Sequence, residues 1–122
     1  MRMATDIEIE MIARVAHEAN RAWCYENGDD SQPRWNDAPA WQCESVREGV
    51  RFVLANPDAS AEASHDAWMR WKLGNGWVYD GVKRPEAKTH PNLRSFAELP
   101  EFQRRKDTLF LAIVRALAPD GA

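Results

Sequence analysis

The chain has few of the features that define a membrane protein or a disulfide-stabilised protein. Its two cysteines, Cys24 and Cys43, lack CxxC spacing, so we expect free thiols rather than a metal site or a redox pair. No apolar run approaches the roughly 20 residues of a membrane helix, and the first residues lack the apolar core of a signal peptide. We therefore expect a cytoplasmic protein with no membrane partner.

An excess of basic residues is also missing. Sixteen lysines and arginines stand against nineteen acidic residues, which gives a formal net charge of −3. A protein that neutralises many phosphates along a duplex needs a basic surface, because that contact is mainly electrostatic. We therefore expect no nucleic acid duplex as a partner, although a local basic patch remains compatible with this balance.

The familiar catalytic motifs are absent too. The chain has no GxxxxGK[ST] loop, no GxGxxG, no HExxH and no GxSxG. His17, His65 and His90 belong to three different predicted elements, so we expect no metal site and no cofactor. We expect a protein that is not an enzyme. An enzymatic alternative would use His90 or His65 as a general base, oriented by Asp66 or Asp107.

What the sequence does contain is helical periodicity in a chain long enough for one domain. With 122 residues and 44% hydrophobic residues, we expect a single domain spanning 1–122 with its core at about 7–117. Four helices are predicted: one at 6–26, one at 38–55, one from Ser60 to about Gly74, and one opened by Pro100 and ended by Pro119. The fold class is mainly α, a compact four-helix domain.

Caps and turn residues set the expected boundaries. Thr5 and Glu8 form a capping-box pattern ahead of the first helix, and Asp37 is expected to cap the second, with Pro39 near its first turn. The third helix should face inward through His65, Trp68, Met69 and Leu73. Strand formers at 77–79, followed by the turn pair at 80–81, predict one short strand pair or hairpin between helices three and four.

Six tryptophans are a heavy load for this length. Indoles serve both as core filler and as stacking surfaces for a planar ligand. Trp23, Trp68 and Trp77 are interpreted as core residues. Trp35 and Trp41 flank the predicted start of the second helix, where either could contact a ligand held near its positive end.

A basic segment follows the predicted strand. Lys83, Arg84, Lys88 and His90 lie within eight positions, close to Tyr79. Cationic donors beside an aromatic face can hold an anionic, ring-containing small molecule such as a nucleotide derivative. A solvated charged loop is the alternative interpretation.

Several separated motifs resemble one family. The segment from Trp77 to Leu93, which contains Trp-Val-Tyr and Lys-Thr-His-Pro-Asn-Leu, resembles the signature of the ryanodine-receptor repeat (RyR) domain. Similar motifs occur at 17–21, 30–35, 38–42, 64–69 and 103–107, and these resemble the single-domain bacterial and phage branch. The family usually has glycine directly after the tyrosine, whereas here Asp80 precedes Gly81.

The resemblance implies a mainly helical fold with short strands. It also implies non-enzymatic recognition of a small nucleotide-derived ligand, as in sensing or sequestering a signalling nucleotide. In the channels such repeats pair about a pseudo-twofold axis, so a lone repeat can form a homodimer. The alternative function is a structural protein–protein interaction or oligomerisation module with no small ligand.

The resulting hypothesis is a domain that binds a small anionic nucleotide-like ligand. The ligand would be held by aromatic stacking on its ring, by cationic contacts to its phosphate and by two further polar contacts. The predicted ligand-binding residues are Tyr79, Lys83, Lys88, His90, Arg21, Gln32, Trp35 and Trp41.

Overall fold

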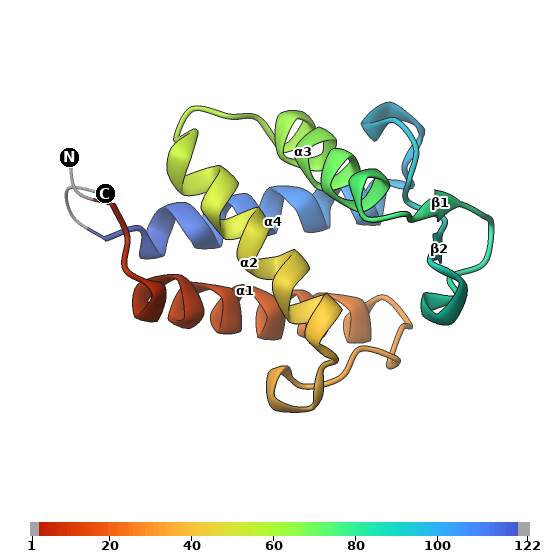
Figure 1. The fold of residues 1–122 in the computed structure, drawn as a ribbon, viewed down its shortest axis with the longest axis horizontal. Coiled ribbons are helices and arrows are strands. Elements are labelled where there is room, and N and C mark those ends of the chain that lie inside the picture. Colours follow the sequence, from red (N-terminus) through yellow and green to blue (C-terminus); the bar gives the residue numbers. More distant parts are fainter. Residues whose placement is uncertain (1–2, 120–122) are drawn as a thin grey trace.

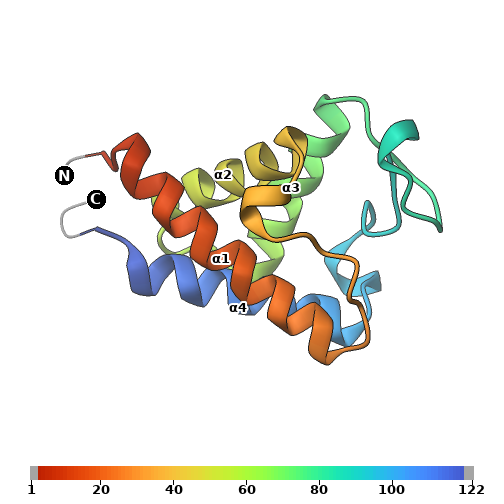
Figure 2. The ribbon, with the colours of Figure 1, turned by 90° about the horizontal axis from the view of Figure 1, so that it is seen from below.

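Four helices form the body of the molecule in a computed structural model that describes residues 3–119. They are α1 (Asp6–Glu26), α2 (Ala40–Ala55), α3 (Ala61–Gly74) and α4 (Glu101–Leu117). Helices α1 and α4 lie side by side and run in opposite directions, while α2 and α3 cover the same side of the bundle (Figures 1 and 2). The mainly α, four-helix fold predicted from the sequence is confirmed.

Two helix starts follow directly from local hydrogen-bond chemistry. The Thr5 hydroxyl accepts the Glu8 N–H at 3.1 Å, and the Glu8 carboxylate accepts the Thr5 N–H at 2.9 Å, which completes a capping box. At α3 the Ser60 hydroxyl accepts the N–H of Ala63 at 3.1 Å. These side chains satisfy backbone donors that have no partner inside the helix.

The predicted start of α2 is wrong by two residues. The helix begins at Ala40, and Pro39 rather than Asp37 occupies its N-cap position. Ala38 precedes a proline, a position that disfavours helical backbone, and it is extended with φ −72° and ψ 141°. Asp37 instead ends a short 3₁₀ turn and forms an exposed ion pair with Arg34 at 3.4 Å.

The main core lies where α1, α2 and α4 meet. Its buried residues include Ile12, Val50, Val53 and Val114, and the ring of Trp35 packs against the same cluster. These side chains recur at helical spacing, so each helix contributes one apolar face. This core fixes the relative positions of the helices that support the site described below.

On α3 the inward face differs from the predicted one. Leu73 is 52% exposed, whereas its neighbour Lys72 is only 3% exposed. His65 and Lys72 are seven residues apart, almost two full turns, so they lie on the same face of the helix. The expectation that Leu73 faces inward is therefore wrong, because the face centred on His65 places Lys72 inward instead.

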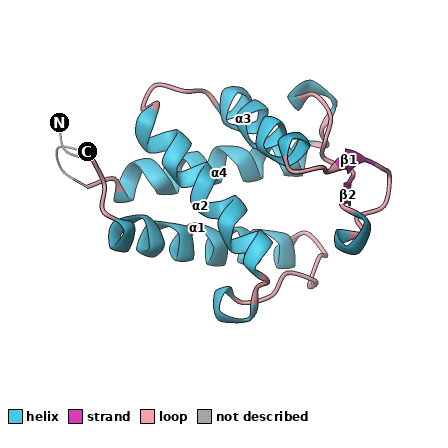
Figure 3. Ribbon diagram, in the orientation of Figure 1, coloured by secondary structure: helices cyan, strands magenta, loops and turns pink. Residues whose placement is uncertain are grey.

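The connection from α3 to α4 carries the only regular strand pair of residues 3–119. β1 (Val78–Tyr79) pairs in parallel with β2 (Thr89–His90), with Val78 opposite Thr89 and Tyr79 opposite His90 (Figure 3). The pair is parallel rather than a hairpin because a 3₁₀ turn, η2 (Pro85–Ala87), brings the chain back beside β1 in the same direction. Directly before β1, the Trp77 ring packs on that of Trp41 near the start of α2, 5.0 Å away centre to centre.

No helix within residues 3–119 combines the length and the apolar content that crossing a membrane requires.

Candidate functional site: a cavity with a cluster of lysines

All four helices and the α3–α4 connection line a partly open cavity of about 190 Å³. Four cationic side chains line it, but only one carboxylate, that of Asp107, does so. The cations are Arg21 on α1, Lys72 on α3, Lys83 on the connection and Lys106 on α4. The lining is completed by neutral amides and hydroxyls and by aromatic rings, so the cavity carries an excess of positive charge although the whole chain is acidic.

Lys72 is the most unusual residue of the cavity. It is 3% exposed, and its ammonium nitrogen lies 4.3 Å from the ring centre of Trp77 and 4.7 Å from that of Trp41. No carboxylate among residues 3–119 pairs with it. Burial, reinforced by the charge of Lys83, lowers the pKa of Lys72 to about 8. The protein therefore keeps a cation in the cavity wall at an energetic cost.

Lys83 adds a second cation at the same end of the cavity. The residue as a whole is exposed, but its ammonium nitrogen lines the cavity 5.7 Å from the Trp41 ring centre. Loss of hydration and the nearby charge of Lys106 lower the pKa of Lys83. Three lysines therefore repel one another across one small volume, an arrangement that an anion placed among them would stabilise.

His90 presents a neutral donor to the lysine end. Its Nδ1 accepts the backbone N–H of Asn92 at 3.0 Å, so the ring hydrogen resides on Nε2. Burial and the charges of the lysines, that of Lys83 first among them, lower the pKa of His90 to about 3. The imidazole is thus uncharged at neutral pH, and none of the described residues accepts a hydrogen bond from Nε2.

Asp107 and His65 lie at a second part of the wall. His65 donates from Nε2 to the carbonyl of Arg94 at 2.7 Å, and its Nδ1 faces Asp107 Oδ2 at 3.6 Å. Burial raises the pKa of Asp107 to about 6. The buried Oδ2 of Asp107 and the buried Oδ1 of Asn20 accept no hydrogen bond from any described residue. The cavity lining therefore contains two acceptor atoms that have no donor among the described residues.

Trp68 connects the two parts of the wall. Its ring stacks on His65 at 5.5 Å and meets His90 edge-on at 5.1 Å, centre to centre. The ring of Trp41 is tilted against that of Trp77 at 5.0 Å. The cavity thus offers flat apolar surface between its cationic and its acceptor-bearing ends, which suits a planar ring.

Five of the residues predicted to bind a ligand line this one cavity. They come from α1, from the loop after it, from α2 and from the α3–α4 connection, and they are Arg21, Gln32, Trp41, Lys83 and His90. Arg21 is partly engaged already, because it forms a salt bridge with Glu18 at 3.2 Å and donates from Nε to the Gln32 carbonyl at 3.3 Å.

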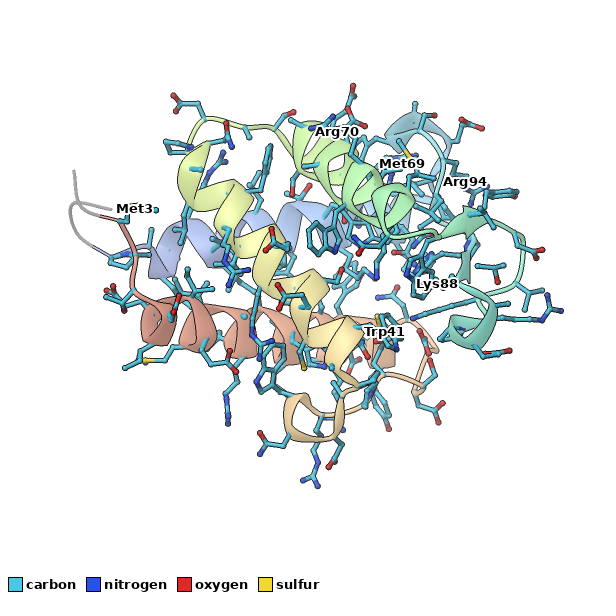
Figure 4. The ribbon with its side chains drawn as sticks, in the orientation of Figure 1. Met3, Trp41, Met69, Arg70, Lys88 and Arg94 are labelled. Atoms are coloured by element: carbon cyan, nitrogen blue, oxygen red, sulfur yellow. The ribbon has the colours of Figure 1, made fainter. Side chains whose placement is uncertain are left out.

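The other three predicted residues lie outside the cavity lining. Tyr79 has an exposed side chain, and Lys88 donates to the carbonyl of Asn75 at 3.0 Å. Lys88 belongs to the segment that precedes β2 (Figure 4). Trp35 is buried in the main core, where its Nε1 donates to Glu10 Oε1 at 3.1 Å. Asp80 accepts the Val82 N–H at 3.0 Å, which stabilises the turn that follows Tyr79.

Two of the lining cations, Lys72 and Lys106, were not among the residues predicted from the sequence. The available signal for Lys72 was its spacing of seven from His65 on a helix that also carries Trp68. Of the pairs considered for an enzymatic alternative, the structure brings His65 and Asp107 together. Both ring nitrogens of His65 already face protein atoms, so the imidazole lines the cavity with its ring rather than with a free nitrogen.

Comparison with models of known protein families finds one family that matches this chain. The model of the RyR domain matches residues 53–117, more than half of the chain. The matched segment includes α3, the strand pair and α4, and with them Lys72, Lys83, His90, Lys106 and Asp107. The chain therefore belongs to the RyR domain family.

Proposed function

We propose that this protein is a non-enzymatic binding domain that captures a small anionic, nucleotide-derived ligand in the cavity between its helices. The observation that carries the proposal is the buried, carboxylate-free ammonium of Lys72 between two indole rings. A buried lysine is costly, and although two indole rings contact the ammonium, no carboxylate among residues 3–119 neutralises it. A phosphate in the cavity would supply the missing counter-charge.

The neighbours of Lys72 fit the same ligand chemistry. Lys83 and Lys106 add charge, and the Nε2–H of His90 adds a neutral donor, so several groups can converge on phosphate oxygens. The half-buried Trp41 ring lines the cavity and offers a surface for a base. The volume of about 190 Å³ lies below the roughly 300–1,000 Å³ typical of drug-sized ligand sites. We therefore favour a mononucleotide, part of which would extend out of this partly open cavity, over an oligonucleotide.

Capture alone would suffice as a function. A domain that binds a signalling nucleotide tightly lowers its free concentration without any chemistry, and a conformational response would make the same domain a sensor. We assign the chain, as part of this proposal, to the single-domain bacterial and phage branch of the family and to the cytoplasm, where signalling nucleotides are found.

The test is a binding titration with a matched pair of charge-removing variants. Isothermal titration and tryptophan emission would be followed with AMP, cyclic AMP, cyclic GMP and ADP-ribose, in low and high salt. We expect at least one probe to bind the parent protein, Lys83→Met to weaken that binding at least tenfold, and Lys88→Met to leave it unchanged. Both variants remove one positive charge from the same connection, so only the cavity position differs.

Two results would refute the proposal. One is the absence of binding by every probe at millimolar concentration. The other is an equal effect of Lys83→Met and Lys88→Met, because that would indicate attraction to a generally basic loop rather than to the cavity.

A second candidate function, self-association, is favoured by an apolar stripe on α1. Ile7, Met11 and Val15 are spaced by four residues and are exposed by 74%, 63% and 47%. Antiparallel packing of two copies about Met11 would place Ile7 opposite Val15, so the stripe is self-complementary in its apolar positions. We propose a homodimer through α1 as the structural alternative.

This alternative is tested by measuring mass. Sedimentation equilibrium of the parent protein and of Met11→Glu should show a dimer that the substitution converts to a monomer, while probe binding in the cavity is unaffected. A monomeric parent protein at 100 μM, a concentration on the order of that at which weak dimers form, would refute it.

A further inference from the structure

The cavity has two chemically different ends. Lys72 marks one end and His65 the other, and both lie on the inward face of α3. Seven residues of helix separate them, which corresponds to about 10 Å along the helix axis at 1.5 Å per residue. This length is comparable to the span from the phosphate to the far edge of the base in a nucleoside monophosphate, so one such ligand could reach both ends.

Two acceptor atoms of the cavity lining have no protein donor. Asp107 Oδ2, which faces His65, and Asn20 Oδ1 on α1 are buried, and neither receives a hydrogen bond from a described residue. Buried acceptors in proteins are nearly always satisfied by protein or by water, so two acceptors that line one cavity without a protein donor can accept from a ligand. Both come from helices, α1 and α4, whose positions are fixed by the main core.

His65 is fixed beside this end. Its Nε2 donates to the Arg94 carbonyl, and its Nδ1 faces Asp107 Oδ2 at 3.6 Å, a distance too long for a hydrogen bond, so Oδ2 stays available to a ligand. The ring stack with Trp68 at 5.5 Å fixes the imidazole plane. A carboxylate left available in this way can discriminate between ligands, because a ligand without a matching donor leaves it unpaired.

We infer that the ligand lies along the cavity with its phosphate among Lys72, Lys83 and Lys106 and with an N–H or O–H donor, from a base amino group or a sugar hydroxyl, on Asp107 and Asn20. The inference rests on the proposed function and adds the orientation of the ligand and the group that determines its identity. The lysine end supplies affinity for any phosphate of suitable size. The Asp107 end selects among phosphates by the presence of a donor.

The experiment uses probes that differ by one donor. Dissociation constants of the full chain would be measured for AMP against purine riboside monophosphate, which lacks the 6-amino group, and against 2′-deoxy-AMP, which lacks a hydroxyl. GMP against IMP tests the 2-amino group. Inorganic pyrophosphate serves as a probe of the lysine end alone. The amino and hydroxyl sources of the donor are thereby separated.

The expected result is a specific interaction between probe and variant. In the parent protein, removing one of these donors should weaken binding roughly 10- to 100-fold, the range for a hydrogen bond to a charged group. In Asp107→Leu the same change of probe should alter binding less than threefold, while pyrophosphate binds as well as or better than before. Asp107→Asn, which keeps one acceptor oxygen, serves as the second variant if the leucine protein does not fold.

The inference and the proposed function fail in different ways. Nucleoside monophosphates that bind through Lys72 but show no donor preference, or the same preference in the Asp107 variants, would overturn the inference and leave the proposed function intact. Failure of every phosphate probe to bind the parent protein would overturn both. A uniform loss of affinity for all probes in Asp107→Leu would assign this residue a merely structural role and would also overturn the inference.

Discussion

Replacing Lys72 with methionine should make the protein more stable and unable to bind its ligand. Methionine keeps the length and most of the packing of the lysine stem, and its sulfur packs well against the rings of Trp41 and Trp77. The substitution removes a charge that is 3% exposed and has no carboxylate partner among residues 3–119. A residue retained against stability is expected at a functional site.

The magnitude follows from the pKa of Lys72. Its fall from 10.5 to about 8 corresponds to a cost of about 3 kcal/mol for holding the charged form in the fold at neutral pH. Loss of the cation–π contacts to the two rings offsets about 1–2 kcal/mol of this gain. We therefore expect Lys72→Met to raise the free energy of unfolding by about 1–2 kcal/mol, or Tm by roughly 4–8 °C.

The pH dependence gives an independent check on this reasoning. Between pH 8 and 10.5 the unfolded chain holds the Lys72 proton more tightly than the folded protein does, so the parent protein gains stability as the pH rises through this window. The advantage of Lys72→Met should therefore shrink as the pH rises from 8 to 10.5. The assay is urea unfolding followed by tryptophan emission, at several pH values.

One result would refute this account of Lys72. If the methionine variant were less stable than the parent protein by 1 kcal/mol or more at pH 7, the ammonium would be a structural cation held by the indole rings. Its burial would then give no reason to place an anion beside it.

Three further predictions concern the rest of the site. Trp41→Leu should weaken the binding of the nucleotide probes, because this ring lies beside the Lys72 and Lys83 ammonium groups. The control Trp35→Phe should leave these affinities unchanged and cost about 1 kcal/mol of stability through the lost hydrogen bond to Glu10. The imidazole ¹⁵N shifts should show a neutral, Nε2-protonated His90 at pH 5, and an imidazolium at that pH would contradict the assignment. Because folding lowers the pKa of His90 from 6.5 to about 3, the contribution of the neutral ring to stability is complete above pH 6.5 and is lost as the pH falls toward 3. Asp107→Asn should stabilise the fold by about 2 kcal/mol above pH 6 in thermal melts and by little near pH 4. The reason is that the raised pKa of Asp107 makes the parent protein lose stability as the pH rises from 3.8 to 6, and equal stabilisation at both pH values would contradict this.

The helices were predictable because their signals are local. The Thr5 capping box, the Ser60 cap and the proline after Leu99 each act within one turn of the helix they begin, so the sequence contains all the partners. The start of α2 was missed where two local rules competed. Asp37 is a good cap in isolation, but the restriction that Pro39 imposes on the preceding residue outweighs it.

The site was only partly predictable because it is assembled from distant segments. A lysine in a helix is usually expected to face solvent, and Lys72 becomes buried only because Trp41 and Trp77 pack against it. Asp107 and His65 are 42 positions apart and meet only through the packing of α3 on α4. The basic segment was recognisable by composition, yet which of its lysines lines the cavity depends on the parallel strand pairing.

The most direct test of the central claim is the pKa of Lys72, measured from its side-chain NMR signals with and without the nucleoside monophosphate that binds best. We expect a value of about 8 in the free protein, as burial dictates, and a rise of at least one pKa unit, equivalent to about 1.4 kcal/mol, when a phosphate neutralises the lysine cluster. A value near 10.5 in the free protein, or one that does not change while the nucleotide is bound, would contradict the account.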